Sequence, residues 1–554
     1  MKFKNLLALT FFMTVSSQAL ANSNQWQITQ PKWLPQHEAE FGNFVTKLGE
    51  AVEQRRCNSV DTCLQSSANI YNGTDPSGLK YYADCADLPY YLRGYFAWKN
   101  GLPFSFVSQV SPNPTLEETP TAAAKDPRYT PQGNFVSKRY DIVAKDGMIK
   151  NTYPNAVQLL NTTIINLTYS ATFRIQGDRD SDRLFSDFYP AIINRNGIRP
   201  GTIIYDPNGH VAVIYRVSDD GRIFYIDAHP DNSLTMGMFT PKFVRSKPAQ
   251  GAGFKNFRPL EIVDAKVTAR GIYAGGRIVG TPNSQLTSYG IEQFYGTHPD
   301  PAGTWNKGKF LYANQPVSFY EYVRLRLMQG EVHIDPLKDM AQVTDDICVS
   351  LQDRVDAVEA ARTAQVYLKP HPERLPYNIF GTDGEWENYA TPSRDARLKV
   401  AFMDLLSQTQ NHIERHKRQD RAIKYSGGNL ARDLYAVYAE RAQACQFSYT
   451  TTNGKTVRMN LEAARQRLFN MSFDPYHCIE LRWGARIPEE LASCTDDMNK
   501  RQWYERQQWL RNQHERTYDA RMDYSLSELT GPLPGVGIAN PPNIDIINYL
   551  KSQF

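Results

Sequence analysis

A cysteine stands directly before a helical pattern in the hexapeptide Ala83-Asp84-Cys85-Ala86-Asp87-Leu88. Apolar side chains recur at helical spacing from about Ala86 to Asn100. Pro89 fits only the first turn of a helix, where its missing N–H is not needed. We therefore expect Cys85 at or next to the helix N-cap. Unpaired backbone N–H groups and the helix dipole at that place stabilise a thiolate, lower its pKa and can hold an oxyanion.

Strand patterns appear about 120 residues after this cysteine. Pro200–Tyr205, His210–Tyr215 and Arg222–Asp227 are apolar runs separated by turns rich in Asp, Asn and Gly, which predicts a strand meander. His210 opens the second strand and Asp227 lies on the third. Because antiparallel neighbours bring side chains together across the ladder, these two residues are expected to meet.

Cys85, His210 and Asp227 together predict the papain-like catalytic arrangement. The cysteine thiolate is the nucleophile, the imidazole holds it as an ion pair and later protonates the leaving amine, and the third residue orients the imidazole. His229 competes with Asp227 for the third role. Other interpretations stay open: Cys85 as a buried structural thiol or disulfide partner, His210 as a core histidine, and a zinc site of Cys85, His210 and His229 that lacks an evident fourth ligand. Asp84 and Asp87 can also simply cap the helix, and their charge raises a thiol pKa.

Three blocks in this order resemble the NlpC-type cell-wall peptidases of the papain-like superfamily. They are the lead-in Tyr71-Asn-Gly-Thr-Asp-Pro-Ser-Gly78, the nucleophile block Asp84-Cys85-Ala86-Asp87-Leu88, and the pair Pro200–Tyr205 and His210–Tyr215. The resemblance implies a Cys85–His210–Asp227 triad, with Tyr71 and Asp84 near the substrate or oxyanion. The chain departs from the family by Ala86-Asp87 in place of Ser-Gly and by a long insertion at about 101–198. The resemblance covers roughly Tyr71 to Leu234.

The resemblance further implies cleavage of an amide bond in peptidoglycan stem peptides through a thioester, with no metal or organic cofactor. Two alternatives remain open. One is a papain-like acyltransferase or amidase on another envelope substrate. The other is a non-enzymatic envelope-binding protein with a vestigial cleft, whose C-terminal helices bind a protein partner.

The N-terminus predicts a secretory signal peptide. Lys2 and Lys4 precede an apolar core from Leu6 to Val15, and Ala19-Leu20-Ala21 fits the small-x-small cleavage rule. We expect cleavage near Ala21 and a periplasmic or secreted protein, the alternative being an uncleaved N-terminal anchor. No later run is apolar and long enough to predict a stable membrane span.

The seven cysteines suit an oxidising compartment, in which six can pair and one remains. Cys85, at its helix start, is the one most easily left free. Spacing suggests three disulfides, although sequence alone does not fix connectivity: Cys57–Cys63, Cys348–Cys445 and Cys478–Cys494.

The length of 554 residues predicts several domains, and a net charge of +4 without a basic run gives no reason to expect a nucleic-acid partner.

The expected fold class is α+β: a papain-like domain, in which the nucleophile helix packs on an antiparallel sheet, followed by a large helical region. The last long helical pattern runs from Cys478 to about Leu529. The predicted organisation is a signal peptide (1–21), an N-terminal helical segment (22–70), the thiol hydrolase domain (71–250), a connecting segment (251–317) without a clear pattern, a helical domain (318–530) and a tail rich in Pro, Gly and Asn (531–554).

Overall fold

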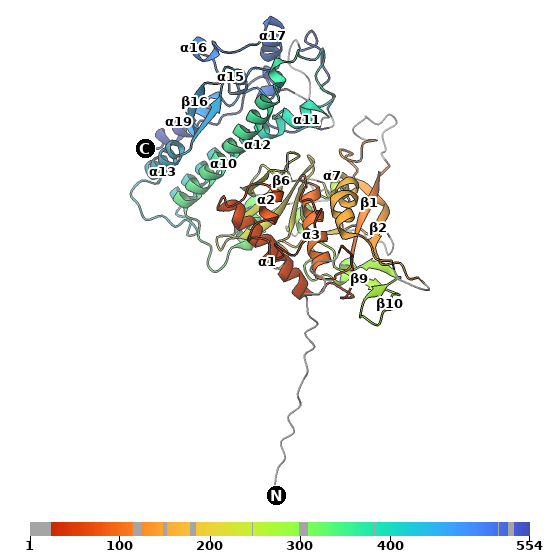
Figure 1. The fold of residues 1–554 in the computed structure, drawn as a ribbon. Coiled ribbons are helices and arrows are strands. Elements are labelled where there is room, and N and C mark those ends of the chain that lie inside the picture. The colour runs from red at the N-terminus through yellow and green to blue at the C-terminus, as the bar shows by residue number, and fades with distance from the viewer. Residues whose placement is uncertain are drawn as a thin grey trace.

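The computed structural model describes residues 24–114, 125–147, 152–177, 184–245, 247–297, 309–381, 384–518, 520–529 and 537–554. The predicted signal peptide and the start of the predicted tail, residues 531–536, lie outside the described residues. Figure 1 shows most of the strands, together with several helices, in the part coloured red to yellow-green, and the longest helices in the green part. The chain is thus a mixture of helices and antiparallel sheets with a helical C-terminal region, as the sequence predicts.

Helix α3 (Asp87–Lys99) forms where its apolar spacing predicts it, and helix α1 (Pro35–Glu53) lies in the predicted N-terminal helical segment. The short helix α2 (Val60–Leu64) lies between them in sequence. Every residue of α3 from Asp87 to Trp98 is buried. Gly49 of α1 lies directly on the Tyr215 ring, where an added Cβ would come within 2.0 Å of the ring, so only glycine allows this close approach.

A central sheet of six antiparallel strands has the order β3-β8-β4-β5-β6-β7. Its strands are β3 (Phe188–Pro190), β4 (Ile203–Asp206), β5 (His210–Val217), β6 (Ile223–Ala228), β7 (Leu234–Met238) and β8 (Gly253–Phe257). The predicted meander is confirmed as β4, β5 and β6. Strand β8 comes from the unassigned segment 251–317 and inserts between β3 and β4. Four of its five residues are buried, so it lacks the alternation of apolar and polar residues by which a half-exposed strand is recognised.

The two faces of this sheet pack against different partners. Val211 and Tyr215 of β5 belong to the apolar core shared with α1 and α3. Ala212 and Ile214 belong to a second core, shared with α9 (Phe319–Leu327). Because successive residues of a strand point to opposite faces, His210 shares the second face with Ala212 and Ile214.

The other strands pair as two-stranded antiparallel units. They are β1 (Phe104–Pro112) with β2 (Asn134–Ile142), β9 (Leu260–Val263) with β12 (Arg277–Gly280), β10 (Lys266–Val267) with β11 (Tyr273–Ala274), β13 (Phe310–Tyr312) with β14 (Gln315–Val317), and β15 (Gln446–Thr450) with β16 (Thr456–Asn460). The hairpin β1–β2 lies in the predicted insertion. Short helical segments accompany these strands: α5 (Ala156–Gln158), the π-helical η2 (Leu159–Ile164), α6 (Ile165–Leu167), α7 (Ser170–Phe173), η3 (Pro248–Gln250), η4 (Asn283–Gln285) and α8 (Glu292–Tyr295).

Three long helices build the core of the C-terminal region, and they are α10 (Pro336–Thr363), α12 (Pro392–Lys417) and α13 (Leu430–Ala444). The C-terminal helix α19 (Ile546–Lys551) buries Ile546 and Leu550 in the same core, so this part of the tail is docked. The remaining elements are η6 (Val366–Leu368), α11 (Glu385–Tyr389), α14 (Leu461–Arg467), α15 (Ile479–Arg482), α16 (Pro488–Leu491), α17 (Met498–Arg506) and α18 (Gln508–Asn512).

The prediction of one long helix from Cys478 to about Leu529 is wrong, because only short helices occupy this segment. A helix spanning Cys478 to Cys494 would separate their Cα atoms by about 24 Å at 1.5 Å per residue. The disulfide between them holds these atoms 5.3 Å apart. The helical spacing of apolar residues is present, but the covalent loop excludes the continuous helix.

All three suggested disulfides are confirmed: Cys57–Cys63, Cys348–Cys445 and Cys478–Cys494. Cys85 is the free cysteine. This disulfide content suits an extracellular or periplasmic protein. Among the described residues, every helix is too short or too polar to span a bilayer.

Candidate active site

Cys85 directly precedes helix α3, whose N-cap is Ala86, as the sequence predicts. The Asp84 carboxylate caps this helix: its Oδ1 accepts hydrogen bonds from the backbone N–H of Ala86 (2.8 Å) and of Asp87 (3.0 Å). Asp84 was expected near the substrate or oxyanion. Its carboxylate instead occupies N–H groups that would otherwise be free to stabilise a thiolate or an oxyanion.

The Cys85 thiol lies against the turn that leads into β5. Its Sγ is 3.8 Å from the carbonyl oxygen of Gly209, and the backbone N–H of Val211 also points to it. These two residues flank His210, so the strand start that carries the imidazole borders the sulfur. The contact is a weak one at this distance, and Cys85 and His210 form no hydrogen bond with each other.

The electrostatic surroundings of Cys85 oppose the expected thiolate. Burial raises the pKa of the Cys85 thiol, and the carboxylates of Asp84, Asp227 and Asp87 raise it further, against the hydrogen bond from Val211. The helix terminus alone predicts a lowered pKa for the Cys85 thiol, and this prediction does not describe the structure. The raised pKa favours the neutral thiol over the thiolate at pH 7.

His210 and Asp227 meet as the meander predicts. His210 Nε2 lies 2.6 Å from Asp227 Oδ2, and both side chains are buried. Burial lowers the pKa of His210, as does the Arg397 guanidinium, while the hydrogen bond to Asp227 acts in the opposite direction. Burial alone would raise the pKa of Asp227, but the hydrogen bond to His210 holds this pKa below its usual range. The imidazole is therefore neutral with its proton on Nε2, and Nδ1 is the nitrogen that can accept a proton.

His229, the alternative third residue, contacts Asp227 only through Thr235. The Thr235 hydroxyl donates to Asp227 Oδ1 at 2.6 Å, and His229 Nε2 lies 3.0 Å from the same hydroxyl. Since that hydroxyl has a single hydrogen, His229 Nε2 must be the donor in the second contact. Asp227 is thus the residue that binds the His210 ring directly, and His229 reaches Asp227 through the Thr235 hydroxyl.

Tyr71 lies at the wrong end of helix α3 for the expected role. Its hydroxyl accepts a hydrogen bond of 2.6 Å from Asn100 Nδ2, and Asn100 is the C-cap of the helix. The 13 residues of α3 span about 20 Å at 1.5 Å per residue, and Cys85 stands at the other end. Burial raises the pKa of Tyr71 to about 12, which fits a core residue packed on Phe44 and Phe96.

Residues that the sequence analysis missed also surround the site. Burial raises the pKa of Tyr205 of β4, Arg174 opposes this shift, and Cys85 adds to it. Arg394 and Arg397 of α12 act electrostatically on His229 and His210. Arg516 pairs with Asp206 at 2.6 Å. The three arginines come from the helical region, more than 160 residues from the nearest motif, so no local pattern could reveal them.

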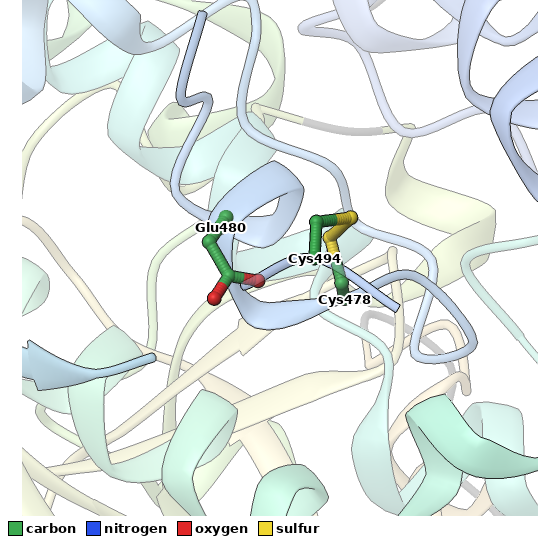
Figure 2. A group of neighbouring side chains, drawn as sticks. All are labelled: Cys478, Glu480 and Cys494. Atoms are coloured by element: carbon green, nitrogen blue, oxygen red, sulfur yellow. A yellow bond between two sulfur atoms is a disulfide. The ribbon is translucent and has the colours of Figure 1, made fainter. Parts of the chain in front are cut away.

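Of the described residues, Cys478, Glu480 and Cys494 form a group of metal-ligating types, with ligand atoms within 4.8 Å of one another. Figure 2 shows the two sulfur atoms joined in a disulfide, so neither is a thiolate ligand. The Glu480 carboxylate accepts hydrogen bonds from Thr452 and Ser493. Glu480 thereby joins the turn of the hairpin β15–β16 to the loop closed by the Cys478–Cys494 disulfide. Within the described ranges, Cys85, His210 and His229 do not form such a group.

Comparison with known proteins adds no relative: no protein-family model, curated protein or solved structure matches the chain.

Proposed function

We propose that the protein is a thiol hydrolase in which Cys85 is the nucleophile, His210 the base and Asp227 the residue that orients the base. One observation carries this proposal: a free, half-buried cysteine at a helix start borders the strand whose first residue, His210, is hydrogen-bonded to Asp227 through the nitrogen remote from catalysis. Among the described residues, His210 Nδ1 has no hydrogen-bond partner, so this nitrogen is available to accept the thiol proton.

The chemistry follows from the neutral state of both groups. The thiol proton passes to His210 Nδ1 as the sulfur attacks the amide carbonyl, and the imidazolium then protonates the leaving amine as the C–N bond breaks. Water, deprotonated by the same nitrogen, cleaves the thioester and restores the thiol. Cys85 must first turn its sulfur from the Gly209 carbonyl to the imidazole, which a change of its χ1 rotamer supplies.

The proposed substrate is an amide bond in peptidoglycan stem peptides, and the proposed family is the NlpC type of papain-like peptidases. The support is the order of three elements: the cysteine before α3, the histidine at the start of β5 and the aspartate on the adjacent strand β6. Three disulfides support a periplasmic or secreted location for such a substrate.

Digestion of purified sacculi tests the proposal. The mature chain is expected to release peptide fragments that mass spectrometry assigns to one cleaved amide bond, and Cys85→Ser is expected to release none. Addition of a soluble amine acceptor separates an acyltransferase, which would give acceptor-linked products, from a hydrolase.

A second candidate is a non-enzymatic envelope-binding protein. The observation that favours it is the raised pKa of Cys85 together with the missing thiol–imidazole hydrogen bond. Sacculus binding that survives Cys85→Ser, without fragment release by the unmodified chain, would establish this alternative.

A further inference from the structure

Two arginines near the proposed site have no ionic partner in the part of the chain that the structure describes. Arg394 and Arg397 lie three residues apart in the first two turns of α12, so they share one helix face. Arg394 Nε is buried without a hydrogen-bond partner. Among the described residues, neither guanidinium lies within 4.0 Å of a carboxylate, in contrast to the neighbouring Arg516, which pairs with Asp206 at 2.6 Å. An unpaired, desolvated cation is costly, and a bound anion removes that cost.

Both arginines line a small cavity next to the His210–Asp227 pair. Its volume is about 40 Å³, and its walls include Asp227, His229 and Thr235. At about 10–15 Å³ for each water, this volume holds about three non-hydrogen atoms, the size of a carboxylate group. The cavity shares Arg394, His229 and Thr235 with an open groove of about 780 Å³ between β7 and α10, which gives a ligand a way in.

The other charged groups of the cavity are already satisfied or close to neutral. Lys242 pairs with Asp346 at 2.9 Å, and Asp227 accepts hydrogen bonds from His210 and Thr235. Burial raises the pKa of Asp353 to about 7, so this carboxyl is only partly ionised at neutral pH. The two guanidinium charges therefore exceed the negative charge of the Asp227 carboxylate and the partly ionised Asp353, and the net charge of the lining is positive.

We propose that this cavity binds a carboxylate of the substrate through Arg394 and Arg397. The guanidinium fork matches a carboxylate in a two-bond geometry, and a carboxylate has the three heavy atoms that this cavity volume accommodates. The identification of the ligand as substrate rests on the proposed hydrolase function. Binding itself does not, because neither arginine takes part in the chemistry.

Binding has a consequence for His210. The Arg397 charge disfavours the imidazolium, so a carboxylate that compensates Arg397 makes His210 a stronger base. A substrate with a free carboxylate would thereby raise the basicity of the group that must accept the Cys85 proton. Arg397 is in this sense a positioning and coupling residue.

The test is calorimetric titration of the full mature chain carrying Cys85→Ser, so that no ligand is consumed. The probes are an N-acetylated alanyl-alanine dipeptide with a free C-terminal carboxylate, the same dipeptide as its C-terminal amide, and inorganic phosphate. The free acid is expected to bind at least tenfold more tightly than the amide, about 1.4 kcal/mol. Arg394→Gln and Arg397→Gln are each expected to weaken the binding of the free acid at least tenfold. The control Arg418→Gln, at the exposed end of the same helix, should leave the affinity unchanged.

Two further measurements exclude a structural role. Since both guanidinium groups are unpaired, their replacement by Gln should leave the melting temperature unchanged or raise it. NMR titration of the His210 ring should show its pKa rising when the free acid binds, and not in Arg397→Gln. Arg397→Lys, which keeps the charge but not the fork, should bind with intermediate affinity.

Equal binding of acid and amide, undiminished binding by both Gln variants, or tight phosphate binding without peptide binding would each overturn the carboxylate assignment. The outcomes of this binding test can be distinguished from those of the sacculus digestion that tests the proposed function. Arginine-dependent binding without sacculus cleavage by the unmodified chain leaves the cavity assigned and removes the hydrolase. Sacculus cleavage without arginine-dependent binding would keep the hydrolase function and remove the carboxylate assignment of the cavity.

Discussion

Two buried histidine–aspartate pairs lie in different parts of the molecule and differ in what their second ring nitrogen meets. In the sheet, His210 Nε2 lies 2.6 Å from Asp227, and in the helical region His371 Nε2 lies 2.8 Å from Asp474. His371 Nδ1 also faces an acceptor, the carbonyl oxygen of Pro372 at 2.7 Å. With acceptors at both nitrogens, His371 is held as the cation. Although burial opposes it, Asp474 and Pro372 raise the pKa of His371.

His210 is the opposite case. One nitrogen is engaged by Asp227, Arg397 disfavours the cation, and a free thiol borders the strand start. His371 stacks on Trp503 with ring centroids 4.1 Å apart, and its side chain has no exposed surface. The difference teaches that a short His–Asp hydrogen bond does not by itself mark an active site. The proposed active site differs from the His371 pair by its neutral ring, whose second nitrogen accepts no hydrogen bond from the described residues.

The largest effect expected from this comparison concerns activity. His210→Gln should lower the rate of sacculus cleavage by about 10²–10⁴-fold, the usual contribution of a general base. His371→Gln should leave the rate per folded molecule within a few fold. The measurement is initial rate, corrected for the folded fraction by circular dichroism. Equal losses in both variants would contradict the distinction between the two pairs.

The next effect concerns stability. Asp474→Asn removes the counter-charge of a buried imidazolium and should cost about 3–5 kcal/mol of unfolding free energy, measured by urea denaturation. Asp227→Asn should cost less, because His210 is neutral and an amide oxygen can still accept from Nε2–H. A larger loss for Asp227→Asn would show that the sheet pair is the charged one.

The pH dependence of stability should have opposite signs for the two histidines. The folded pKa of His371 is raised, so its contribution is present below the unfolded value of about 6.5 and is lost as pH rises through the folded value. The folded pKa of His210 is lowered, so its contribution is present above about 6.5 and is lost as pH falls. Relative to the unmodified chain, His371→Gln should lose most stability at low pH and His210→Gln at high pH. Urea titrations from pH 5 to 8 measure both slopes, and slopes of the same sign would refute the assignment.

The sequence could predict those parts of the fold and site that depend on local pattern. Helices α1 and α3, strands β4 to β6 and the His210–Asp227 contact follow from apolar spacing and from turns between adjacent strands. The disulfide pairs followed from short spacings and from the position of Cys85. Strand β8, whose buried run carries no alternation, could not be assigned.

The remaining parts depend on distant packing. Tyr71 was placed near the thiol by motif order, but its ring fills the aromatic core at the far end of α3. A lowered thiol pKa was expected from the helix terminus, and burial among carboxylates overrides it. Arg394 and Arg397 reach the site from the helical region, and their separation in sequence hides them from any motif.

The smallest effect concerns the carboxylate that caps α3 beside the thiol. Asp84 raises the pKa of Cys85, and its Oδ1 also accepts the capping hydrogen bonds from Ala86 and Asp87. Asp84→Asn keeps an acceptor oxygen and removes the charge, so the helix should form as before while the thiol pKa falls. Alkylation of Cys85 at pH 8, followed by mass spectrometry, should be several-fold faster, since one pKa unit corresponds to tenfold more thiolate.

Asp264→Asn, which removes an exposed carboxylate after β9, is the matched control and should not change the alkylation rate. The alkylation comparison also bears on the two histidines. If burial and the carboxylates keep Cys85 protonated, His210→Gln should alter its alkylation little in the absence of substrate, because the neutral ring contributes no charge. A strong slowing by His210→Gln would mean that the imidazole already holds the thiolate as an ion pair. The free nitrogen of His210 would then be engaged in the resting protein, and its contrast with His371 would disappear.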